Sequence, residues 1–359
     1  MFGSEKDLRE FGALIGRLAM NRQRLSKKET FEAYRQIILN EQPELQQGAF
    51  LLAHIIRGPS SEEMLGALEA MNTYDLLQIH SRRPGQVCDI DGTGSASLKT
   101  VEYGASAALI AAACGLQVAK KGARSVTGTA AATETFERLG IDIEQAIALA
   151  EISLAECGFC FLPAEAYMKS SWRRLSGKMR FTSLFNLLGP LTRPCAESSC
   201  IVLGTYSPHV SNQLVDLLQI NGFSSAICSY GMAEGIDIEM GVDGISPCGD
   251  SLVVELTPDG KVSSYELRPE DFGARPCRFE EIAASPDPDS NARRIFDILS
   301  GKKAESPEGR FFCINAAAML KVSGIAPDFK VGYLMASQAL ASGAAFNKFV
   351  QFKSFQGLK

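Results

Sequence analysis

The first part of the chain carries apolar residues at helical spacing. From residue 8 to about residue 74 they recur three and four positions apart, as in the stretches 11–18 and 31–38. Ser60 and Glu63 have the S-x-x-E spacing of a capping box, which opens another helix. The pattern therefore predicts a small all-helical domain over residues 1–80.

After residue 83 the pattern changes to short apolar strands that alternate with helices. The strand candidates are residues 87–90, 116–119, 158–162, 199–203, 225–229 and 251–256. Such alternation is typical of βαβ units, so we expect an α/β domain over 81–359 with a mostly parallel central sheet flanked by helices. A later helical stretch near 165–190 is expected to pack on the helical domain.

The net charge and the cysteines of the chain indicate which partners and which compartment to expect. The formal net charge of -5 gives no general attraction to nucleic acid or to anionic membranes, so neither is the expected partner. The ten cysteines are scattered, and the chain begins without a signal segment, which favours thiols in a reducing cytoplasm. The longest apolar run, 105–118, is too short to span a bilayer. We expect a cytoplasmic protein.

A glycine loop lies between the first strand candidate and the next helix. It reads Asp91-Gly92-Thr93-Gly94-Ser95, and a helix that begins after it offers free backbone N–H groups to a phosphate. Gly92, Thr93 and Gly94 are therefore candidate phosphate-binding residues. The loop lacks the third glycine of a dinucleotide motif and the lysine of a P-loop, so a simple tight turn is an equally good interpretation.

A second loop after the next strand gathers cations and hydroxyl groups. Its candidates for binding an anion are Lys120, Arg124, Ser125, Thr127 and Gly128. By itself the loop would be interpreted as a solvated basic turn. Two such loops at the ends of successive strands favour a phosphate site, because ligands of open α/β sheets bind outside the carboxyl ends of the strands.

Together the two loops resemble a region of the anthranilate phosphoribosyltransferases, whose pattern is approximately GTGGDGKNTFNIST followed later by KHGNRSVSS. Further similarity lies at 57–59, 185–191 and 244–247, so the resemblance covers most of the chain. It identifies the chain as a divergent member of this family, within glycosyltransferase family 3 and its nucleoside phosphorylase-like fold. The resemblance implies a helical domain hinged to an α/β domain, a substrate cleft between them and a homodimer.

The chain departs from the family pattern where the donor, phosphoribosyl diphosphate, would bind. Ala96 replaces the acidic residue of GTGGD, and Glu102, Gly104 and Ala105 replace the Asn, Ser and Thr of NIST. A carboxylate at Glu102 would repel a diphosphate unless a cation lay between them. The resemblance therefore predicts an altered donor site.

The family's magnesium-binding Asp-Glu pair falls here at Asp243-Gly244, which lacks one carboxylate. Glu239 is the candidate to replace it, because oxygen ligands suit magnesium. The alternation of residues 236–240 fits equally well the solvent-exposed face of a strand. Magnesium is thus the cofactor that the resemblance implies, with Asp243 and Glu239 as its candidate ligands.

An arginine in the family binds the carboxylate of the acceptor anthranilate. Direct counting places Gly177 and Thr182 at the two arginine positions, and a small insertion or deletion is needed to bring Arg174 or Arg180 there. A guanidinium suits a carboxylate, so Arg174 and Arg180, with Asn186, are the candidate acceptor-binding residues.

Two functions follow from these observations. The first is an enzyme, a pentosyltransferase that moves a sugar phosphate from a phosphorylated donor to an unidentified small-molecule acceptor, for which an aromatic compound is one candidate; a nucleoside-phosphorylase-type reaction is a variant. The second is a non-catalytic protein of the same fold that binds nucleic acid or another ligand through a basic cleft. The acidic net charge disfavours nucleic acid. No catalytic residue can be assigned from the sequence.

Overall fold

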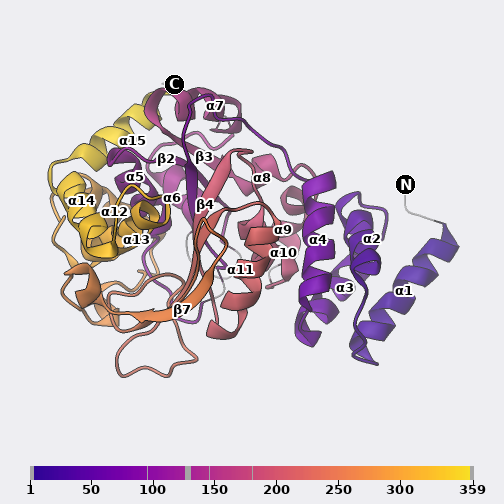
Figure 1. Cartoon of the computed structure of the whole chain (residues 1–359). Coiled ribbons are helices and arrows are strands. Elements are labelled where there is room, and N and C mark those ends of the chain that lie inside the picture. Colours follow the sequence, from indigo (N-terminus) through magenta and orange to yellow (C-terminus); the bar gives the residue numbers. More distant parts are fainter. Residues whose placement is uncertain (1–3, 95, 126–130, 145, 180, 356–359) are drawn as a thin grey trace. The chain divides into compact units, whose positions relative to one another are not determined.

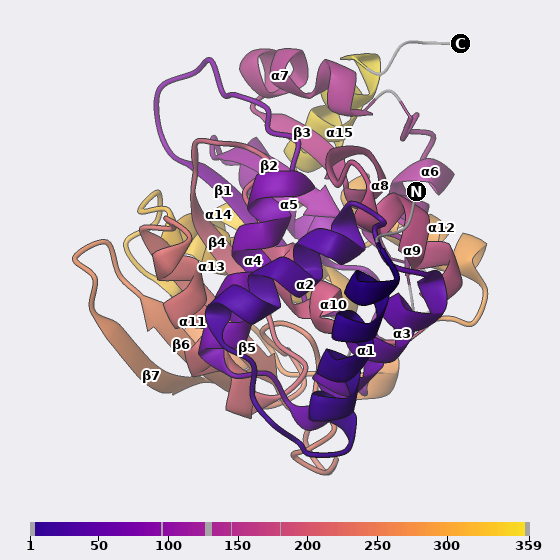
Figure 2. The same ribbon diagram turned by 90° about the vertical axis from the view of Figure 1, so that its right-hand side faces the viewer.

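Two units make up the fold of the computed structural model, which describes residues 4–94, 96–125, 131–144, 146–179 and 181–355. The helical unit comprises Met1–Leu77 and Ala164–Thr192, and the sheet unit comprises Gln78–Pro163 and Arg193–Lys359. Figures 1 and 2 show the elements of both units.

The helical unit is built from amphipathic helices that share one aromatic core. Tyr34 and Phe50 contact each other edge to face at 5.9 Å between ring centroids, and Tyr34 meets Phe185 at 5.5 Å. These contacts join helices that are far apart in sequence. The helices are α1 (Glu5–Ala19), α2 (Lys27–Ile38), α3 (Glu44–Arg57), α4 (Ser61–Tyr74), α8 (Ala164–Tyr167), α9 (Ser171–Met179), α10 (Leu184–Leu188) and the 3-10 helix Gly189–Leu191.

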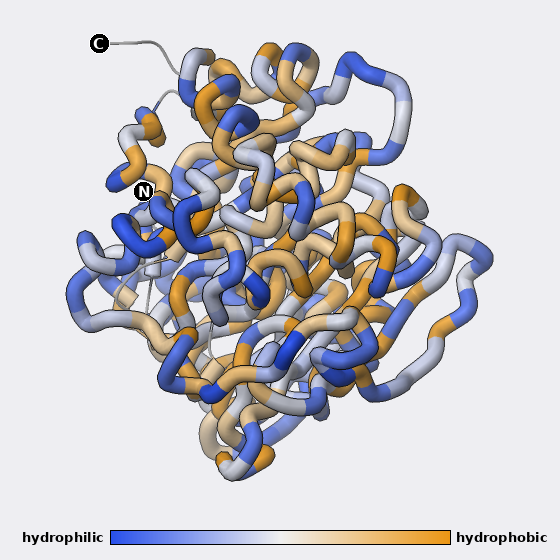
Figure 3. Tube along the Cα trace, turned by 90° about the vertical axis from the view of Figure 1, so that its left-hand side faces the viewer, coloured by the Kyte–Doolittle hydropathy of each residue, from blue (hydrophilic) through white to orange (hydrophobic). Residues whose placement is uncertain are grey.

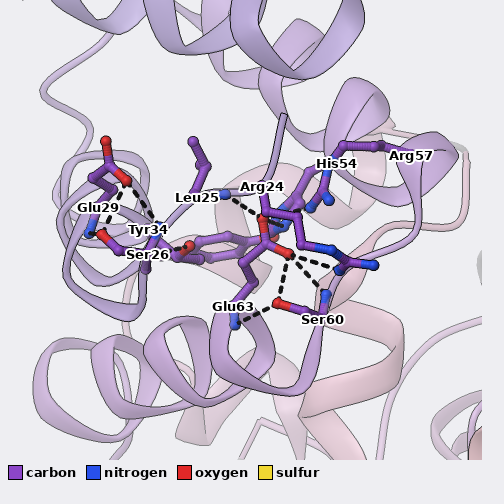
Figure 4. Close-up of polar contacts among 10 residues, drawn as sticks. Arg24, Leu25, Ser26, Glu29, Tyr34, His54, Arg57, Ser60 and Glu63 are labelled. Carbon is purple, nitrogen blue, oxygen red and sulfur yellow. Dashed lines mark hydrogen bonds and ion pairs between the residues drawn. The ribbon is translucent and has the colours of Figure 1, made fainter. Parts of the chain in front are cut away.

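Glu63 is the buried polar centre of this unit. As predicted, it forms a capping box with Ser60 at the start of α4, and its carboxylate also accepts the backbone N–H of Leu25 at 2.7 Å. Arg57 pairs with the same carboxylate at 2.5 Å, and Nε2 of His54 lies 3.7 Å away. Figure 4 shows these groups converging on Glu63 from three segments of the chain. A buried carboxylate is stable only with such partners, so Glu63 fixes the relative positions of these segments.

The described part of the sheet unit contains a seven-stranded sheet with strand order β3-β2-β1-β4-β5-β6-β7. The first five strands in this order are parallel, and β6 and β7 are antiparallel. The predicted fold class is therefore confirmed. The strands are β1 (Val87–Gly92), β2 (Gln117–Gly122), β3 (Phe159–Pro163), β4 (Ser198–Gly204), β5 (Ser225–Gly231), β6 (Ser251–Leu256) and β7 (Val262–Leu267).

Helices cover both faces of this sheet. Helix α5 packs on β1 and β2 and against α13 and α15, while α11 packs on β5 and β6; Figures 1 and 2 place α11 opposite α13 across the sheet. The alanine side chains of α5 let it lie buried along nearly its whole length. The helices are α5 (Gly104–Ala113), α6 (Ala132–Arg138), α7 (Ala146–Cys157), α11 (Ser211–Ile220), α12 (Pro288–Leu299), α13 (Pro307–Val322), α14 (Phe329–Ala341) and α15 (Ala344–Phe355).

Hydrophobic residues follow the buried strands and the inner sides of these helices. Figure 3, seen from the side of α12 to α15, shows apolar stretches inside and polar stretches along many of the outer loops. Within the described ranges, no helix combines the length and the apolar character that crossing a membrane requires.

Candidate functional site

Four of the parallel strands, β1, β2, β4 and β5, end on glycine. A side chain at Gly92 would come within 2.6 Å of Oδ2 of Asp243, and one at Gly204 would also collide with Asp243. At Gly231 a side chain would lie 2.6 Å from the carbonyl oxygen of Gly244. The glycines therefore let the segment 241–246 lie against the carboxyl ends of β1, β4 and β5, where ligands of such sheets bind.

Asp243 holds the predicted glycine loop. Its Oδ2 accepts the backbone N–H of Gly94 at 2.7 Å, and the Tyr103 hydroxyl donates to its backbone carbonyl. The other carboxylate oxygen, Oδ1, is buried and has no hydrogen-bond partner in the described part of the chain. Burial raises the pKa of Asp243 to about 6, with the charge of Asp91 acting in the same direction. The negative charge of Asp243 is therefore costly to bury and only partly compensated by hydrogen bonds.

Glu102 occupies the N-terminus of α5. Both of its carboxylate oxygens lie 3.1 Å from the backbone nitrogen of Ala105, which donates to them. Burial raises the pKa of Glu102, and the charge of Lys120 opposes this shift. A helix N-terminus attracts anions, and here the chain's own carboxylate lies at that position.

Two lysines are buried at the end of β2 and have internal carboxylate partners. Nζ of Lys120 lies 3.7 Å from Oδ1 of Asp91 and also donates to the carbonyl oxygen of Lys121. Nζ of Lys121 lies 2.8 Å from Oδ2 of Asp89. Burial raises the pKa of Asp91, although the two lysines act against that rise. The predicted cation Lys120 therefore lies between the β1 end and the α5 N-terminus.

The rest of the second loop meets carboxylates of α6. Arg124 donates to both oxygens of Glu137, at 2.7 and 2.5 Å, and the backbone N–H of Ser125 donates to Glu134 at 3.0 Å. The predicted residues Thr127 and Gly128 lie outside the described residues. Each described group of this loop that was expected to bind phosphate thus has a carboxylate nearby in the chain itself.

Two of the predicted acceptor residues, Arg174 and Asn186, belong to the helical unit. Arg174 donates to Oε1 of Gln47 at 2.9 Å and to the carbonyl oxygen of Ile37 at 2.6 Å, so it connects α9 to α2 and α3. The side-chain oxygen of Asn186 accepts the backbone N–H of Ser183 at 2.9 Å and caps α10. Arg180 lies outside the described residues.

The two predicted metal ligands lie in different surroundings. Asp243 is in the buried loop just described, whereas the side chain of Glu239 is 67% exposed and lies 3.9 Å from Nε2 of His209. Among the residues described, no three His, Cys, Asp or Glu side chains are grouped as metal ligands. Only Asp243 of this pair therefore belongs to the strand-end site.

Sequence reasoning missed several residues of this site. Asp91, the first residue of the glycine loop, and Tyr103 were given no role. A usable signal was present: glycine stands at the end of each of the strands β1, β2, β4 and β5. Repeated glycine at strand ends indicates that another backbone approaches closely there.

Comparison with known proteins places the chain in a family. The family model described as "Glycosyl transferase family, a/b domain" matches residues 84–346, and "Glycosyl transferase family, helical bundle domain" matches residues 13–74. The anthranilate phosphoribosyltransferase of Desulfosudis oleivorans is 32% identical over 338 residues, which are 94% of this chain and 96% of that protein. This chain belongs to the anthranilate phosphoribosyltransferase family. The family member of Methanobrevibacter smithii is 31% identical over 91% of this chain and 95% of its own length.

Solved structures of the anthranilate phosphoribosyltransferase family have the same fold. The enzyme of Thermus thermophilus superimposes with a TM-score of 0.83 at 27% identity, covering 96% of this chain and 99% of that one. The Saccharomyces cerevisiae enzyme, solved in complex with PRPP and Mg, also gives 0.83, at 22% identity and 98% coverage of both chains. The family fold is therefore retained over nearly the whole chain.

Proposed function

We propose that this protein transfers a sugar phosphate, of the phosphoribosyl class, from a phosphorylated donor to a small aromatic acceptor. One observation carries the proposal: Lys120, the N-terminus of α5 and the loop held by Asp243 lie at the carboxyl ends of neighbouring parallel strands. This is where an open α/β sheet binds its ligand. The similarity to the two phosphoribosyltransferases named above extends over nearly the whole length of each, and it supports the same reaction class.

The chemistry asks for positioning and for neutralisation of the leaving group. Displacement at the anomeric carbon of a sugar builds positive charge on the sugar and negative charge on the departing phosphate. Lys120, buried beside the α5 N-terminus, is the cation of the site that is placed to stabilise a leaving phosphate oxygen. Carboxylates of the site, such as Asp91, would face the positive sugar. Fixed geometry can supply much of the rate enhancement.

The donor site is proposed to differ from that of the relatives. A diphosphate that binds at the α5 N-terminus must compete with the Glu102 carboxylate for the same backbone N–H groups. The repulsion between the Glu102 carboxylate and the donor would be reduced by a donor with less negative charge, or by a cation that accompanies the diphosphate. We propose that one of these two conditions holds.

One residue of this site, Asp243, offers a ligand that suits magnesium. Oδ1 of Asp243 is a buried carboxylate oxygen without a hydrogen-bond partner in the described chain, and magnesium is often held by one or two carboxylates together with substrate phosphates. Asp243 would therefore hold the ion. Bound there, magnesium would neutralise charge on the donor phosphates.

The acceptor is proposed to be aromatic but to bind without the Arg174 guanidinium. That side chain already donates to Gln47 and Ile37, and binding a substrate carboxylate would break these contacts. Anthranilate therefore has less support than an aromatic acceptor without that carboxylate. Nucleic acid, the alternative partner, has no support from this site, because Lys121 and Arg124 pair with internal carboxylates.

A homodimer, as the family resemblance implies, is part of this proposal. Leu45, Leu52 and Ile56 of α3 are 86%, 43% and 67% exposed and follow one another at intervals of about two and one helical turns. An exposed apolar stripe of this kind favours association. Sedimentation should show a species of twice the 38.7 kDa chain mass, and a monomer at micromolar concentration would contradict this part of the proposal.

Calorimetric titration with phosphoribosyl diphosphate, with and without magnesium, tests the donor. Ribose 5-phosphate, inorganic phosphate and single-stranded nucleic acid serve as comparison ligands. Binding of the diphosphate that requires magnesium, or binding of a monophosphate without it, would support the proposal. Binding of nucleic acid that weakens steeply with salt, with no binding of any sugar phosphate, would overturn it.

A further inference from the structure

Two cysteines from separate segments of the sheet unit lie in contact. The Sγ atoms of Cys248 and Cys277 are 3.6 Å apart and share a hydrogen bond. Their backbones are adjacent as well, since the N–H of Cys277 donates to the carbonyl oxygen of Pro247 at 3.0 Å. This backbone pairing holds the two side chains together, and only a small movement would bring the sulfurs to bonding distance, about 2.05 Å.

Cys277 is also accessible, which distinguishes it from most thiols of the chain. All ten cysteines lie in the described ranges, and only Cys114 and Cys277 are not fully buried. Cys88 and Cys200 are paired across β1 and β4 but are wholly buried in the sheet. Cys114 is half-buried, and burial raises its pKa to about 11. Cys277 therefore combines partial exposure with a thiol neighbour.

The surroundings of Cys277 favour its thiolate form. The hydrogen bond between Cys277 and Cys248 lowers the pKa of Cys277 most, and the charge of Arg310 acts in the same direction. Burial and the charges of Glu281 and Glu308 oppose this. The same hydrogen bond and burial raise the pKa of Cys248. Thiolates are the nucleophilic form of cysteine.

We infer that Cys277 and Cys248 form an oxidation site, at which a peroxide such as hydrogen peroxide converts the two thiols to a disulfide. The Cys277 thiolate attacks one peroxide oxygen: an S–O bond forms, the O–O bond breaks, and the leaving hydroxide takes a proton to become water. The sulfur of Cys248 then attacks Sγ of the resulting sulfenic acid. An S–S bond forms, the S–O bond breaks, and a second water leaves, so two thiols lose two electrons and one peroxide gains them.

A disulfide between Cys248 and Cys277 would join two segments that support the candidate site at the carboxyl ends of the strands, where Asp243 and Glu102 lie. Cys248 follows the loop that carries Asp243, with the backbone N–H of Ile245 fixed by Asn315 at 3.1 Å. Downstream of Cys277, the carbonyl oxygen of Ile282 accepts the N–H of Val101 at 2.9 Å, next to Glu102. The disulfide would therefore connect the segment that follows Asp243 with the segment that contacts Val101, next to Glu102. This holds whatever reaction the site performs.

Peroxide treatment of the full-length protein tests the site. After brief exposure to hydrogen peroxide and alkylation in denaturant, we expect titratable thiols to fall from ten to eight, the ten of the sequence minus the two joined. Intact mass should fall by two hydrogen atoms, peptide mapping should link Cys248 to Cys277, and dithiothreitol should restore the original mass. Each of C248S and C277S should abolish the link, and C114S should leave it unchanged.

Several results would overturn the inference. One is a disulfide between other cysteines, and another is oxidation of Cys277 to sulfinic acid without a link to Cys248. A third is that C277S loses two hydrogen atoms on treatment, as the wild type is expected to. If C248S does not fold, C248A replaces it, since the site needs only the loss of one sulfur. Circular dichroism before and after treatment confirms that the chain reacts while folded. A failure here leaves the proposed transferase function untouched, because that function is read out by donor binding.

Discussion

Replacing Glu102 by glutamine tests the central feature of the site, the carboxylate at the α5 N-terminus. The side chain keeps its shape, and its remaining carbonyl oxygen can still accept the N–H of Ala105. Only the charge is removed. We therefore expect the Glu102→Gln variant to bind phosphate and phosphoribosyl diphosphate more tightly than the wild type.

The magnitude follows from the electrostatics of a partly buried site. Neighbouring charges influence each other strongly at about 4–6 Å, and at an effective dielectric constant of about 20 two unit charges at that separation interact by about 3–4 kcal/mol. Solvent and the opposing charge of Lys120 reduce this. A net gain of about 1.4–2.8 kcal/mol remains reasonable, which corresponds to about 10- to 100-fold in Kd.

Calorimetry with inorganic phosphate and with the diphosphate provides the measurement. The matched control is Glu29→Gln, because Glu29 also accepts backbone N–H groups at a helix start but lies in the helical unit. Its affinity for phosphate should equal that of the wild type. Equal phosphate affinity, within twofold, for the wild type and a folded Glu102→Gln variant would refute the competition between carboxylate and phosphate.

The pH dependence of the same comparison gives an independent check. Burial raises the pKa of Glu102, so protonation removes its charge as the pH falls through that raised value. The advantage of Glu102→Gln over the wild type should therefore shrink as the pH is lowered. Using the ratio of the two affinities cancels the ionisation of the phosphate ligand itself. A ratio that stays constant from pH 7 to pH 4 would contradict this reasoning.

Three further predictions concern the two units separately. Glu63→Ala should destabilise the helical unit by about 3–5 kcal/mol, because it leaves a buried arginine and a buried N–H without their partner, whereas the more exposed Glu29→Ala should cost about 1 kcal/mol or less. Fluorescence of Trp172, the only tryptophan of the chain, follows urea unfolding of that unit, and equal losses would contradict the burial argument. Gly204→Ala should displace Asp243 and abolish phosphate binding, with Gly48→Ala, which has open space in α3, as a calorimetric control that keeps wild-type binding. For Asp243, the pKa in the folded protein is raised to about 6 from 3.8, so the folded state holds more protons than the unfolded state and the contribution of this group to stability falls as the pH rises between these values. Thermal melts of the wild type and Asp243→Asn from pH 4 to pH 7 should show the variant gaining relative stability with pH, and a constant difference would count against the raised pKa.

Much of the fold could be predicted because its signals are local. The capping box of Ser60 and Glu63 lies within four residues, and the six predicted strands are apolar runs that the sheet buries. The strand Val262–Leu267 was missed because it is an edge strand whose residues alternate between exposed and partly buried positions. Its pattern, with two serines at its centre, does not differ from that of a polar loop.

The site was predicted only in part because its energetics depend on contacts between distant residues. The loops around Gly92 and Lys120 were located from the glycines and cations of the sequence. No local pattern shows that Lys121 pairs with Asp89, 32 residues earlier, or that Arg124 pairs with Glu137. The positions of Thr127 and Arg180 are outside the described residues, so their roles remain predictions.

Glu102 and Gly104 are best understood together, as two parts of one arrangement at the start of α5. A side chain at Gly104 would lie 3.0 Å from Oε1 of Glu102 and 3.9 Å from Nζ of Lys120, so the absence of a side chain makes room for the carboxylate and the ammonium to approach each other. A serine at this position would crowd the carboxylate. Since Lys120 is buried, it needs a counter-charge whenever no phosphate is bound, and Glu102 and Asp91 provide it. The chain thus stabilises this buried lysine with its own anions, and a phosphate that bound here would have to replace an interaction that the protein already makes.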